Sequence, residues 1–262
     1  MKLVFKQLGT GRPLIILHGL YGSGDNWYTV GKALSKHFDV FLIDLRNHGL
    51  SPHDPEMSNS LMTADLEEFF TDMKIENASI IGHSMGGKIA MRFALKNPEK
   101  ISKLVVVDVA MRSYETSENF NNEARLHQKI IDSLGKLDIS SSRSRVDIDS
   151  ELSEYLKPKP LRDFLLKNLK RRINGEFYWA LNIESLKNNI FNILEGIDSG
   201  GKTFNRPVML IVGKQSDYVT SEDYAQFREV FPHLRIEELE TGHWVHAEQP
   251  ERTIELLTEF LI

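Results

Sequence analysis

Residues 79–90 read Ser-Ile-Ile-Gly-His-Ser-Met-Gly-Gly-Lys-Ile-Ala, and this stretch decides the fold. It contains a G-x-S-x-G motif, Gly82-His-Ser84-Met-Gly86, directly after an apolar run and directly before a helical pattern. A serine placed between a strand and a helix in this way occupies a sharp, strained turn that exposes its hydroxyl, an arrangement known as the nucleophile elbow. The motif therefore predicts Ser84 as a catalytic nucleophile; the alternative is a glycine-rich turn with an incidental serine.

The glycines of the motif have a steric reason. Side chains at positions 82 and 86 would collide with the neighbouring strand and helix, so both positions require a residue without one. The helix that follows also points its first N–H groups toward negative charge that develops near Ser84.

Short apolar runs and helical patterns alternate on both sides of this motif. Fully buried parallel strands read as continuous apolar runs because helices cover both faces of the sheet. The alternation of strands with helices predicts an α/β protein with a mostly parallel, doubly wound sheet. The predicted buried strands are residues 14–17, 40–43, 79–81, 104–107 and 208–212, the predicted edge strands are 3–5 and 235–239, and the predicted helices are 61–73, 87–95, 224–230 and 253–261.

The alternation stops between residues 112 and 205, a polar stretch without a convincing strand. It contains a serine-rich segment at 140–144 and a Pro-Lys-Pro turn at 158–160, and the run 161–173 carries leucines at helical spacing. A disordered loop is disfavoured because the aromatic side chains of this stretch need packing partners; these are Phe164, Phe177, Tyr178, Trp179 and Phe191. We therefore expect a core from residues 1–111 and 206–262, with a helical cap from residues 112–205 over the carboxyl edge of the sheet.

A second glycine-containing loop, Leu17-His-Gly-Leu-Tyr-Gly22, follows the first buried strand. In this fold the oxyanion is held by one backbone N–H after the nucleophile and another from this early loop. We expect these to be the N–H groups of Met85 and Leu20, with Gly19 allowing the backbone to approach the substrate closely. His18 is expected to hold the loop by hydrogen bonds; a role as catalytic base is the alternative.

The catalytic base is expected late in the chain and the acid between the serine and the base, as in other proteins with this elbow. Of the two late histidines, His243 lies on the loop immediately after a predicted strand and can reach the nucleophile, whereas His246 lies further along. Two aspartates compete as the acid. Asp108 ends the strand 104–107, and Asp217 lies one residue after the common position of the acid, which Ser216 occupies here. Either carboxylate could fix the imidazole tautomer, so the sequence leaves both open.

Five stretches together resemble one subgroup of the α/β hydrolases, the YbfF-type esterases and their mitochondrial abhydrolase relatives. They are residues 18–23 (His-Gly-Leu-Tyr-Gly-Ser), 44–52 (Asp-Leu-Arg-Asn-His-Gly-Leu-Ser-Pro), 82–88 (Gly-His-Ser-Met-Gly-Gly-Lys), 107–108 (Val-Asp) and 242–248 (Gly-His-Trp-Val-His-Ala-Glu). The resemblance implies the α/β-hydrolase fold and a triad of Ser84, Asp108 and His243. Segment 44–52 is expected to be structural, with Arg46 bracing neighbouring loops through bidentate hydrogen bonds.

Composition narrows the possible partners. The 262 residues carry a formal net charge of -5, are 41% hydrophobic and include no cysteine. These values give no general electrostatic reason to expect nucleic acid or an anionic membrane as a partner, and they exclude disulfides, thiolate metal sites and a cysteine nucleophile. Since the sequence shows no signal peptide, membrane span, metal cluster or dinucleotide motif, we expect a cytoplasmic monomer or homodimer without cofactor or metal.

The sequence therefore predicts a serine hydrolase that cleaves a carboxylic ester or an acyl thioester through an acyl-enzyme on Ser84. Substrate contacts are expected from His18, Gly19, Tyr21, Trp179 and Trp244, and the preference for acyl-chain length from Trp179 and Phe191. Other reactions of the same fold remain alternatives, namely acyl transfer, carbon–carbon bond hydrolysis and lyase chemistry, as does a ligand receptor that retains the triad.

A cationic run falls within the predicted cap and consists of Lys167, Lys170, Arg171 and Arg172. The simpler expectation is a solvated helix face. The alternative is a site for an anionic leaving group such as a coenzyme A phosphate, which would favour an acyl-CoA thioester as substrate.

Overall fold

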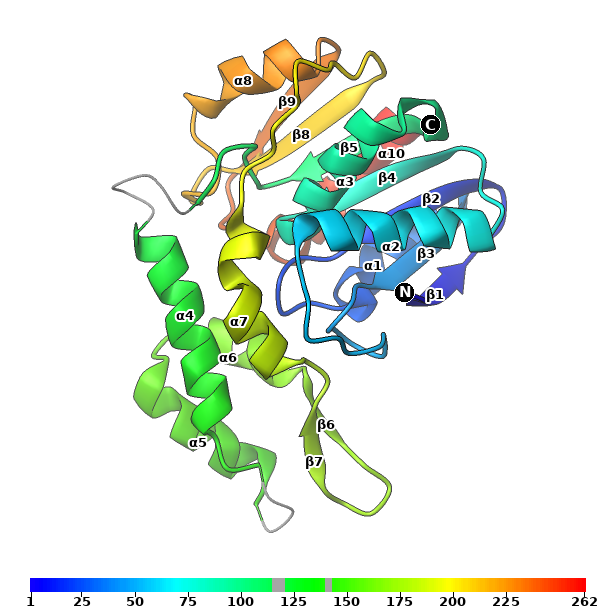
Figure 1. Ribbon diagram of the computed structural model, residues 1–262. Helices are drawn as coiled ribbons and strands as arrows, with labels where there is room; N and C mark the ends of the chain where they lie inside the picture. The colour runs from blue at the N-terminus through cyan, green and yellow to red at the C-terminus, as the bar shows by residue number, and fades with distance from the viewer. Residues whose placement is uncertain (115–120, 140–142) are drawn as a thin grey trace.

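A seven-stranded sheet forms the centre of the protein in the computed structural model, which describes residues 1–114, 121–139 and 143–262 (Figure 1). The strands are β1 Val4–Leu8, β2 Arg12–Leu17, β3 Phe38–Asp44, β4 Ala78–His83, β5 Ile101–Val107, β8 Val208–Gly213 and β9 Leu234–Leu239. Their order is β1-β3-β2-β4-β5-β8-β9, in which β1 runs antiparallel to β3 and every other neighbouring pair is parallel. All seven predicted strands are present and the predicted edge strands lie at the edges, so the predicted fold is confirmed.

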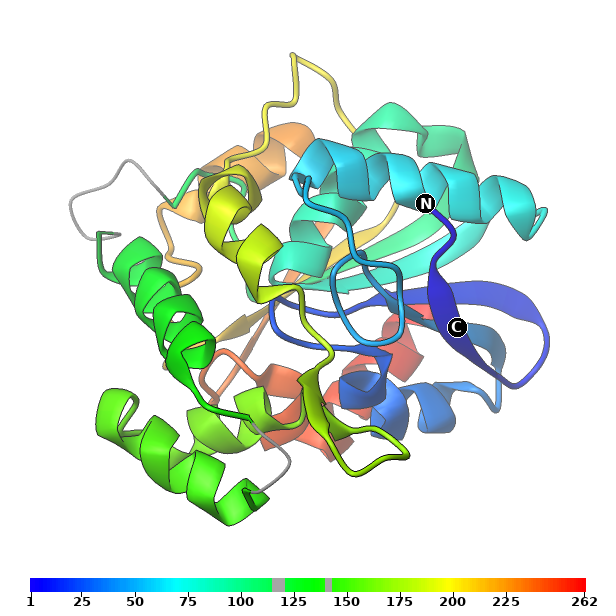
Figure 2. The same cartoon turned by 60° about the horizontal axis from the view of Figure 1, so that its bottom comes forward.

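Helices cover both faces of this sheet. They are α1 Tyr28–Leu34, α2 Asn59–Asp72, α3 Met85–Lys96, α8 Asp223–Val230, α9 Val245–Glu248 and α10 Pro250–Leu261, with the 3-10 turns η1 Gly24–Trp27 and η2 Pro98–Lys100. In Figure 2, α2 (cyan) lies above the sheet, and α1 (blue) and α10 (red) lie below it. The four helices predicted in the core are confirmed, whereas α1 was not predicted, because its 7 residues make only about two turns and carry little periodic signal.

The strand side chains alternate between these two layers. In β2, Leu14 and Ile16 pack with α1 and α10, whereas Ile15 and Leu17 pack with α2 and α3 on the opposite face. Both sets are buried, which explains why the strands read as continuous apolar runs. Within the described ranges, no helix combines the length and the apolarity that crossing a bilayer requires.

The segment between β5 and β8, which we call the insert (residues 112–205), lies against the carboxyl ends of the strands (Figure 1). Its elements are α4 Asn121–Lys136, α5 Arg145–Tyr155, α6 Lys159–Leu166, β6 Leu169–Arg171, β7 Phe177–Trp179 and α7 Ile183–Leu194. Residues 115–120 and 140–142, which include part of the serine-rich segment, lie outside the described residues.

The run 161–173, which its leucine spacing predicts as a helix, divides into two elements. Helix α6 ends at Leu166, and residues 169–171 continue as β6, which pairs with β7 in an antiparallel hairpin. The connecting turn contains Asn174-Gly175, and Gly175 has φ 91°, a conformation that glycine adopts without strain. An Asn-Gly pair is a hairpin signal, and here it outweighs the helical spacing of the leucines.

Lys88 is a buried cation that joins the insert to the core. Its ammonium group donates to the carbonyl oxygen of Arg112 at 3.0 Å, where the insert begins. It also donates to the carbonyl oxygens of Leu194, at 3.1 Å, and Glu195 at the end of α7. The last carbonyls of a helix carry partial negative charge, so a cation is stabilising there. Lys88 therefore ties both ends of the insert to α3.

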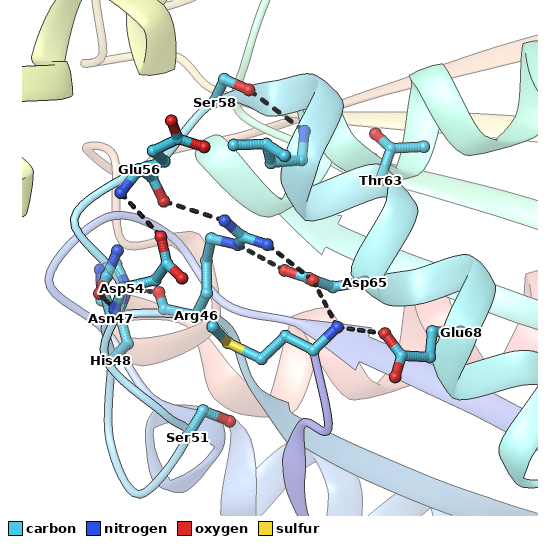
Figure 3. A network of polar contacts seen from close by, with 12 residues as sticks. Arg46, Asn47, His48, Ser51, Asp54, Glu56, Ser58, Thr63, Asp65 and Glu68 are labelled. Atoms are coloured by element: carbon cyan, nitrogen blue, oxygen red, sulfur yellow. Dashed lines mark hydrogen bonds and ion pairs between the residues drawn. The ribbon is translucent and has the colours of Figure 1, made fainter.

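The loop after β3 is held by Arg46 (Figure 3). Its guanidinium group donates to both carboxylate oxygens of Asp65, at 2.5 and 2.8 Å, and to the carbonyl oxygen of Glu56 at 2.9 Å. The amino group of Met1 lies 3.0 Å from the same carboxylate. This network fixes the loop to α2, and it confirms the bidentate bracing predicted for Arg46.

Candidate active site

Ser84 occupies the turn between β4 and α3, with φ 51° and ψ -120°. Its N–H donates to the Val107 carbonyl at 3.0 Å, and its own carbonyl accepts from the Gly87 N–H at 2.8 Å. A residue other than glycine is strained in this conformation, and such strain is typical of functional sites. The structure therefore places the predicted nucleophile on a sharp strand-to-helix turn.

The two motif glycines leave no room for side chains. A Cβ atom on Gly82 would lie 2.3 Å from the carbonyl oxygen of Gly86, in the first turn of α3. A Cβ atom on Gly86 would lie 2.5 Å from the carbonyl oxygen of Leu17, at the end of β2. The collisions with helix and strand that the sequence predicts are confirmed.

Asp108 and His243 form a hydrogen-bonded pair near the same edge of the sheet. Asp108 follows β5 and is buried, and its Oδ2 lies 2.7 Å from Nδ1 of His243. The other carboxylate oxygen accepts the Gly213 N–H at 3.0 Å, so Asp108 is held from two sides. Asp217 is exposed, and none of the described residues forms a hydrogen bond or an ion pair with its side chain. Of the two candidate acids, the structure brings Asp108 to His243.

Three further residues, which the sequence did not identify, contact this pair or support it. The Ser216 hydroxyl donates to Asp108 Oδ2 at 2.5 Å. Ser216 therefore supports the carboxylate of Asp108 from the position at which many members of the fold carry the catalytic aspartate. The Tyr218 ring stacks on His243, with centroids 3.9 Å apart and planes inclined by 18°. Its hydroxyl lies 3.1 Å from Nε2 of His127, a buried residue of α4. His243 is therefore fixed at one ring nitrogen and along one ring face.

Ser84 and His243 line a single cavity of about 450 Å³ between the core and the insert. The insert contributes mainly apolar side chains to its wall, namely Leu126, Ile130, Pro158, Pro160, Leu161 and Phe164. The core contributes Gly19, Leu20, Tyr21 and Trp244, all of which were predicted near the substrate. Among the described residues that line this cavity, none is a lysine, arginine, aspartate or glutamate.

The backbone near Ser84 offers two N–H groups for an oxyanion. The N–H of Leu20 makes no hydrogen bond within the described ranges, and Leu20 lines the cavity. Met85 is the first residue of α3, where the N–H groups have no partner within the helix. A Cβ atom on Gly19 would lie 2.8 Å from Nδ1 of His83 and 3.1 Å from Cβ of Ser84, so a side chain at this position would push the loop away from the serine.

Two residues predicted to contact substrate lie elsewhere. His18 is buried behind the loop, where Nε2 accepts the Leu45 N–H at 3.0 Å and Nδ1 lies 2.8 Å from Gly19 O. It therefore holds the loop and does not line the cavity. Trp179, the last residue of β7, lines a separate depression between α4 and α7. Phe191, predicted to influence chain length, is largely exposed on α7. These positions place Trp179 and Phe191 away from Ser84.

Burial lowers the pKa of several histidines around the site. The pKa falls to about 4 for His18 and His127, and to about 3 for His48 and His246, because desolvation penalises the charged form. These four side chains are therefore neutral at pH 7. Among the described residues, no cluster of three histidine, aspartate or glutamate side chains has a geometry that could hold a metal ion.

We expect acid to destabilise the protein through these histidines. The unfolded chain protonates them near pH 6.5, whereas the folded chain protonates them only near pH 3 to 4. Between these values the unfolded state binds more protons, so stability is lost as the pH falls, by about 1 kcal/mol per pH unit for each histidine. Urea unfolding at a series of pH values measures the slope.

A matched pair of variants checks this origin. His246→Phe should reduce the slope of the unfolding free energy against pH by the contribution of about one proton taken up on unfolding, because the His246 imidazole is buried against Trp27. His37→Gln, at an exposed position, should leave the slope unchanged. A free energy of unfolding that stays constant between neutral and acid pH would contradict the expectation.

Comparisons with known proteins identify the family. The family described as "alpha/beta hydrolase fold" matches residues 12–250. The "sn-1-specific diacylglycerol lipase ABHD11" of Danio rerio is 36% identical over 262 residues, which cover 98% of this chain and 81% of the relative. The "Esterase YbfF" of Escherichia coli is 31% identical over 252 residues, which cover 95% of this chain and 92% of the relative. A solved structure, "Marine microorganism esterase", is 44% identical over 99% of both chains, with a TM-score of 0.93. The chain therefore belongs to the α/β-hydrolase family, and within it to an esterase-type subgroup.

Proposed function

We propose that this protein is a serine hydrolase that cleaves carboxylic esters, and acyl thioesters by the same chemistry, through an acyl-enzyme on Ser84. One observation carries the proposal: the elbow serine and an aspartate-bound histidine line the same apolar cavity. This is the arrangement that nucleophilic acyl transfer requires, because the serine needs a neighbouring base and the base needs a group that orients it. The esterase and lipase names of the relatives support the same reaction class.

The proposed mechanism assigns one step to each group. Asp108 accepts a hydrogen bond from the His243 Nδ1–H, which leaves Nε2 unprotonated and able to take the proton of the Ser84 hydroxyl. The Ser84 oxygen attacks the acyl carbon, and the N–H groups of Leu20 and Met85 hold the oxyanion. The imidazolium then protonates the leaving alcohol or thiol as the bond to the acyl carbon breaks. Water, deprotonated by the same histidine, attacks the acyl carbon of the acyl-enzyme; the bond from this carbon to the Ser84 oxygen breaks, the imidazolium returns the proton to that oxygen, and the acid is released.

The cavity favours uncharged, apolar acyl groups. Apart from His127, its insert wall is built from leucine, isoleucine, proline and phenylalanine side chains, and no lysine, arginine, aspartate or glutamate of the described residues lines it. Burying an apolar chain there is favourable, whereas a charge would lose its hydration without a partner. We therefore propose neutral acyl esters as the preferred class, and acyl-CoA thioesters only where the nucleotide remains outside the cavity.

A graded substrate panel tests the function. Aryl esters and coenzyme A thioesters of increasing acyl length should be turned over many times per enzyme molecule, with Ser84→Ala as the background. Turnover of esters no faster than by this variant would contradict the proposal and would favour a ligand receptor that retains the triad.

We further propose that residues 112–205 act as a cap that selects substrates. Phe164 lies in the cavity wall and contacts Trp244, so Phe164→Ala should change the ratio of kcat/KM between a medium-chain and an acetyl ester by about tenfold. Phe191→Ala removes an exposed phenylalanine from the same insert and should leave the ratio unchanged. Equal losses on all chain lengths in Phe164→Ala would indicate a structural role only.

A further inference from the structure

Four cations without carboxylate partners lie on the β6–β7 hairpin and at the end of α6, which leads into it. Lys167, Lys170, Arg171 and Arg172 are exposed, and in the part of the chain that the structure describes none of them forms an ion pair. They fall within six consecutive residues of a chain whose formal net charge is -5. The run is therefore a local positive region on an acidic protein, and three of its four cations lie on a hairpin instead of the predicted helix face.

An apolar side chain stands at the tip of the same hairpin. Ile173 is fully exposed in the turn that follows Arg172, and the turn is closed by the bond from the Arg172 N–H to the Glu176 carbonyl at 2.8 Å. Figures 1 and 2 show the turn projecting beyond the neighbouring elements. At the base, the exposed Val146 of α5 shares a shallow depression with Lys167, and Arg145, Asp149 and Asp163 also line it. Two exposed aliphatic side chains thus border the cations.

The arginines are arranged on aromatic rings. The Arg171 guanidinium lies 4.5 Å from the Phe177 ring centroid and that of Arg172 lies 4.9 Å from the Tyr178 centroid. Lys170 is paired with Tyr178 across the hairpin, so they share one face. An amphipathic tyrosine between cations is suited to the boundary between lipid headgroups and acyl chains.

The base of the hairpin is held rigidly. The Ala180 N–H donates to Asn168 O at 2.8 Å, and the Asn168 side chain donates to the carbonyl of Tyr21, also at 2.8 Å. Arg145 donates to the carbonyl oxygens of Leu166 and Leu169, at 2.5 and 2.6 Å. The projecting cations are therefore mounted on a fixed support, and that support contacts the loop that carries Leu20.

We infer that the β6–β7 hairpin is a docking site for the surface of an anionic lipid bilayer. Lys167, Lys170, Arg171 and Arg172 bind the phosphate headgroups, and Ile173 enters the acyl boundary. A solvated cationic face would need no exposed isoleucine at its apex, and a site for a free phosphate would need a concave pocket around the cations. The combination of cations without carboxylate partners, aromatic rings and an apolar tip matches peripheral membrane binding.

Vesicle cosedimentation tests this inference separately from hydrolysis, with every protein carrying Ser84→Ala so that no lipid is cleaved. The protein that has only Ser84→Ala, with the hairpin unchanged, should bind vesicles that contain phosphatidylglycerol. It should bind vesicles of pure phosphatidylcholine much more weakly. Arg171→Gln with Arg172→Gln should weaken binding by about 25-fold, since each cation near an anionic surface contributes about fivefold. Ile173→Ser should weaken it by about tenfold.

The control carries the same change of net charge elsewhere. Arg206→Gln with Arg228→Gln alters two exposed arginines, one before β8 and one on α8, and should leave binding within about twofold because distant charges are screened. Circular dichroism, and hydrolysis of a water-soluble ester with Ser84 restored, check that the hairpin variants fold. The inference is overturned if vesicles are not bound, if the control weakens binding equally, or if coenzyme A or phosphate binds these cations while vesicles do not.

Discussion

Replacing Ser84 by alanine is expected to abolish ester hydrolysis, with a loss in kcat of about 10⁴-fold or more. The reason is chemical, because alanine has no oxygen to attack the acyl carbon and no other serine of the chain lines the cavity among the described residues. The N–H groups of Leu20 and Met85 would remain, so a small residual rate above water is expected. Steady-state kinetics on a short aryl ester give the measurement.

The fold should survive this change. Ser84 makes its hydrogen bonds in the turn through its backbone, which alanine retains, and its side chain does not cap α3. The matched control is Ser102→Ala, which removes a serine hydroxyl that bonds Ser79 on the sheet and should keep full activity. An active Ser84→Ala protein with the same circular dichroism spectrum would refute the assignment of the nucleophile.

Asp108→Asn is expected to lower kcat by about 10²- to 10⁴-fold while leaving the protein folded. An asparagine that keeps the bond from the Gly213 N–H to its oxygen turns its NH₂ group toward His243. That group cannot accept the Nδ1–H, so the imidazole loses the partner that fixes its tautomer and stabilises its charged form. The pH dependence of kcat should change as well as the value of kcat.

Asp217→Asn provides the comparison. This carboxylate is exposed and contributes little to an imidazolium that it does not contact, so kcat should remain within about tenfold. Both variants are measured side by side, with circular dichroism to exclude unfolding. If the Asp217 variant were the inactive one, the acid would come from the loop after β8 and the proposed triad would be wrong.

The fold was predictable because its information is local. The elbow stretch 79–90 contains the strand, the turn glycines and the start of the helix within twelve residues. Each buried strand can be recognised from the sequence as a continuous apolar run. The contact between His243 and Asp108 was harder to predict, because the two residues are 135 positions apart and Asp217 offered an equal pattern.

What could not be predicted depends on three-dimensional placement. Ser216 reads as a missing acid, yet its hydroxyl reaches a carboxylate 108 positions away. Trp179 and Phe164 are both aromatic residues of the insert, and only the path of the chain puts Phe164 in the cavity wall and Trp179 outside it. The hairpin that contains Trp179 had a local signal, Asn174-Gly175, which the leucine spacing of 161–173 concealed.

Labelling with a fluorophosphonate, followed by peptide mass spectrometry, tests the central claim most directly. The reagent forms a covalent bond only with a serine oxygen that a neighbouring base activates. We expect a single adduct, on the peptide that contains Ser84, with hydrolysis lost in proportion to labelling and with no adduct in Ser84→Ala. An adduct on another residue, or labelling that persists in Ser84→Ala, would contradict the proposed mechanism.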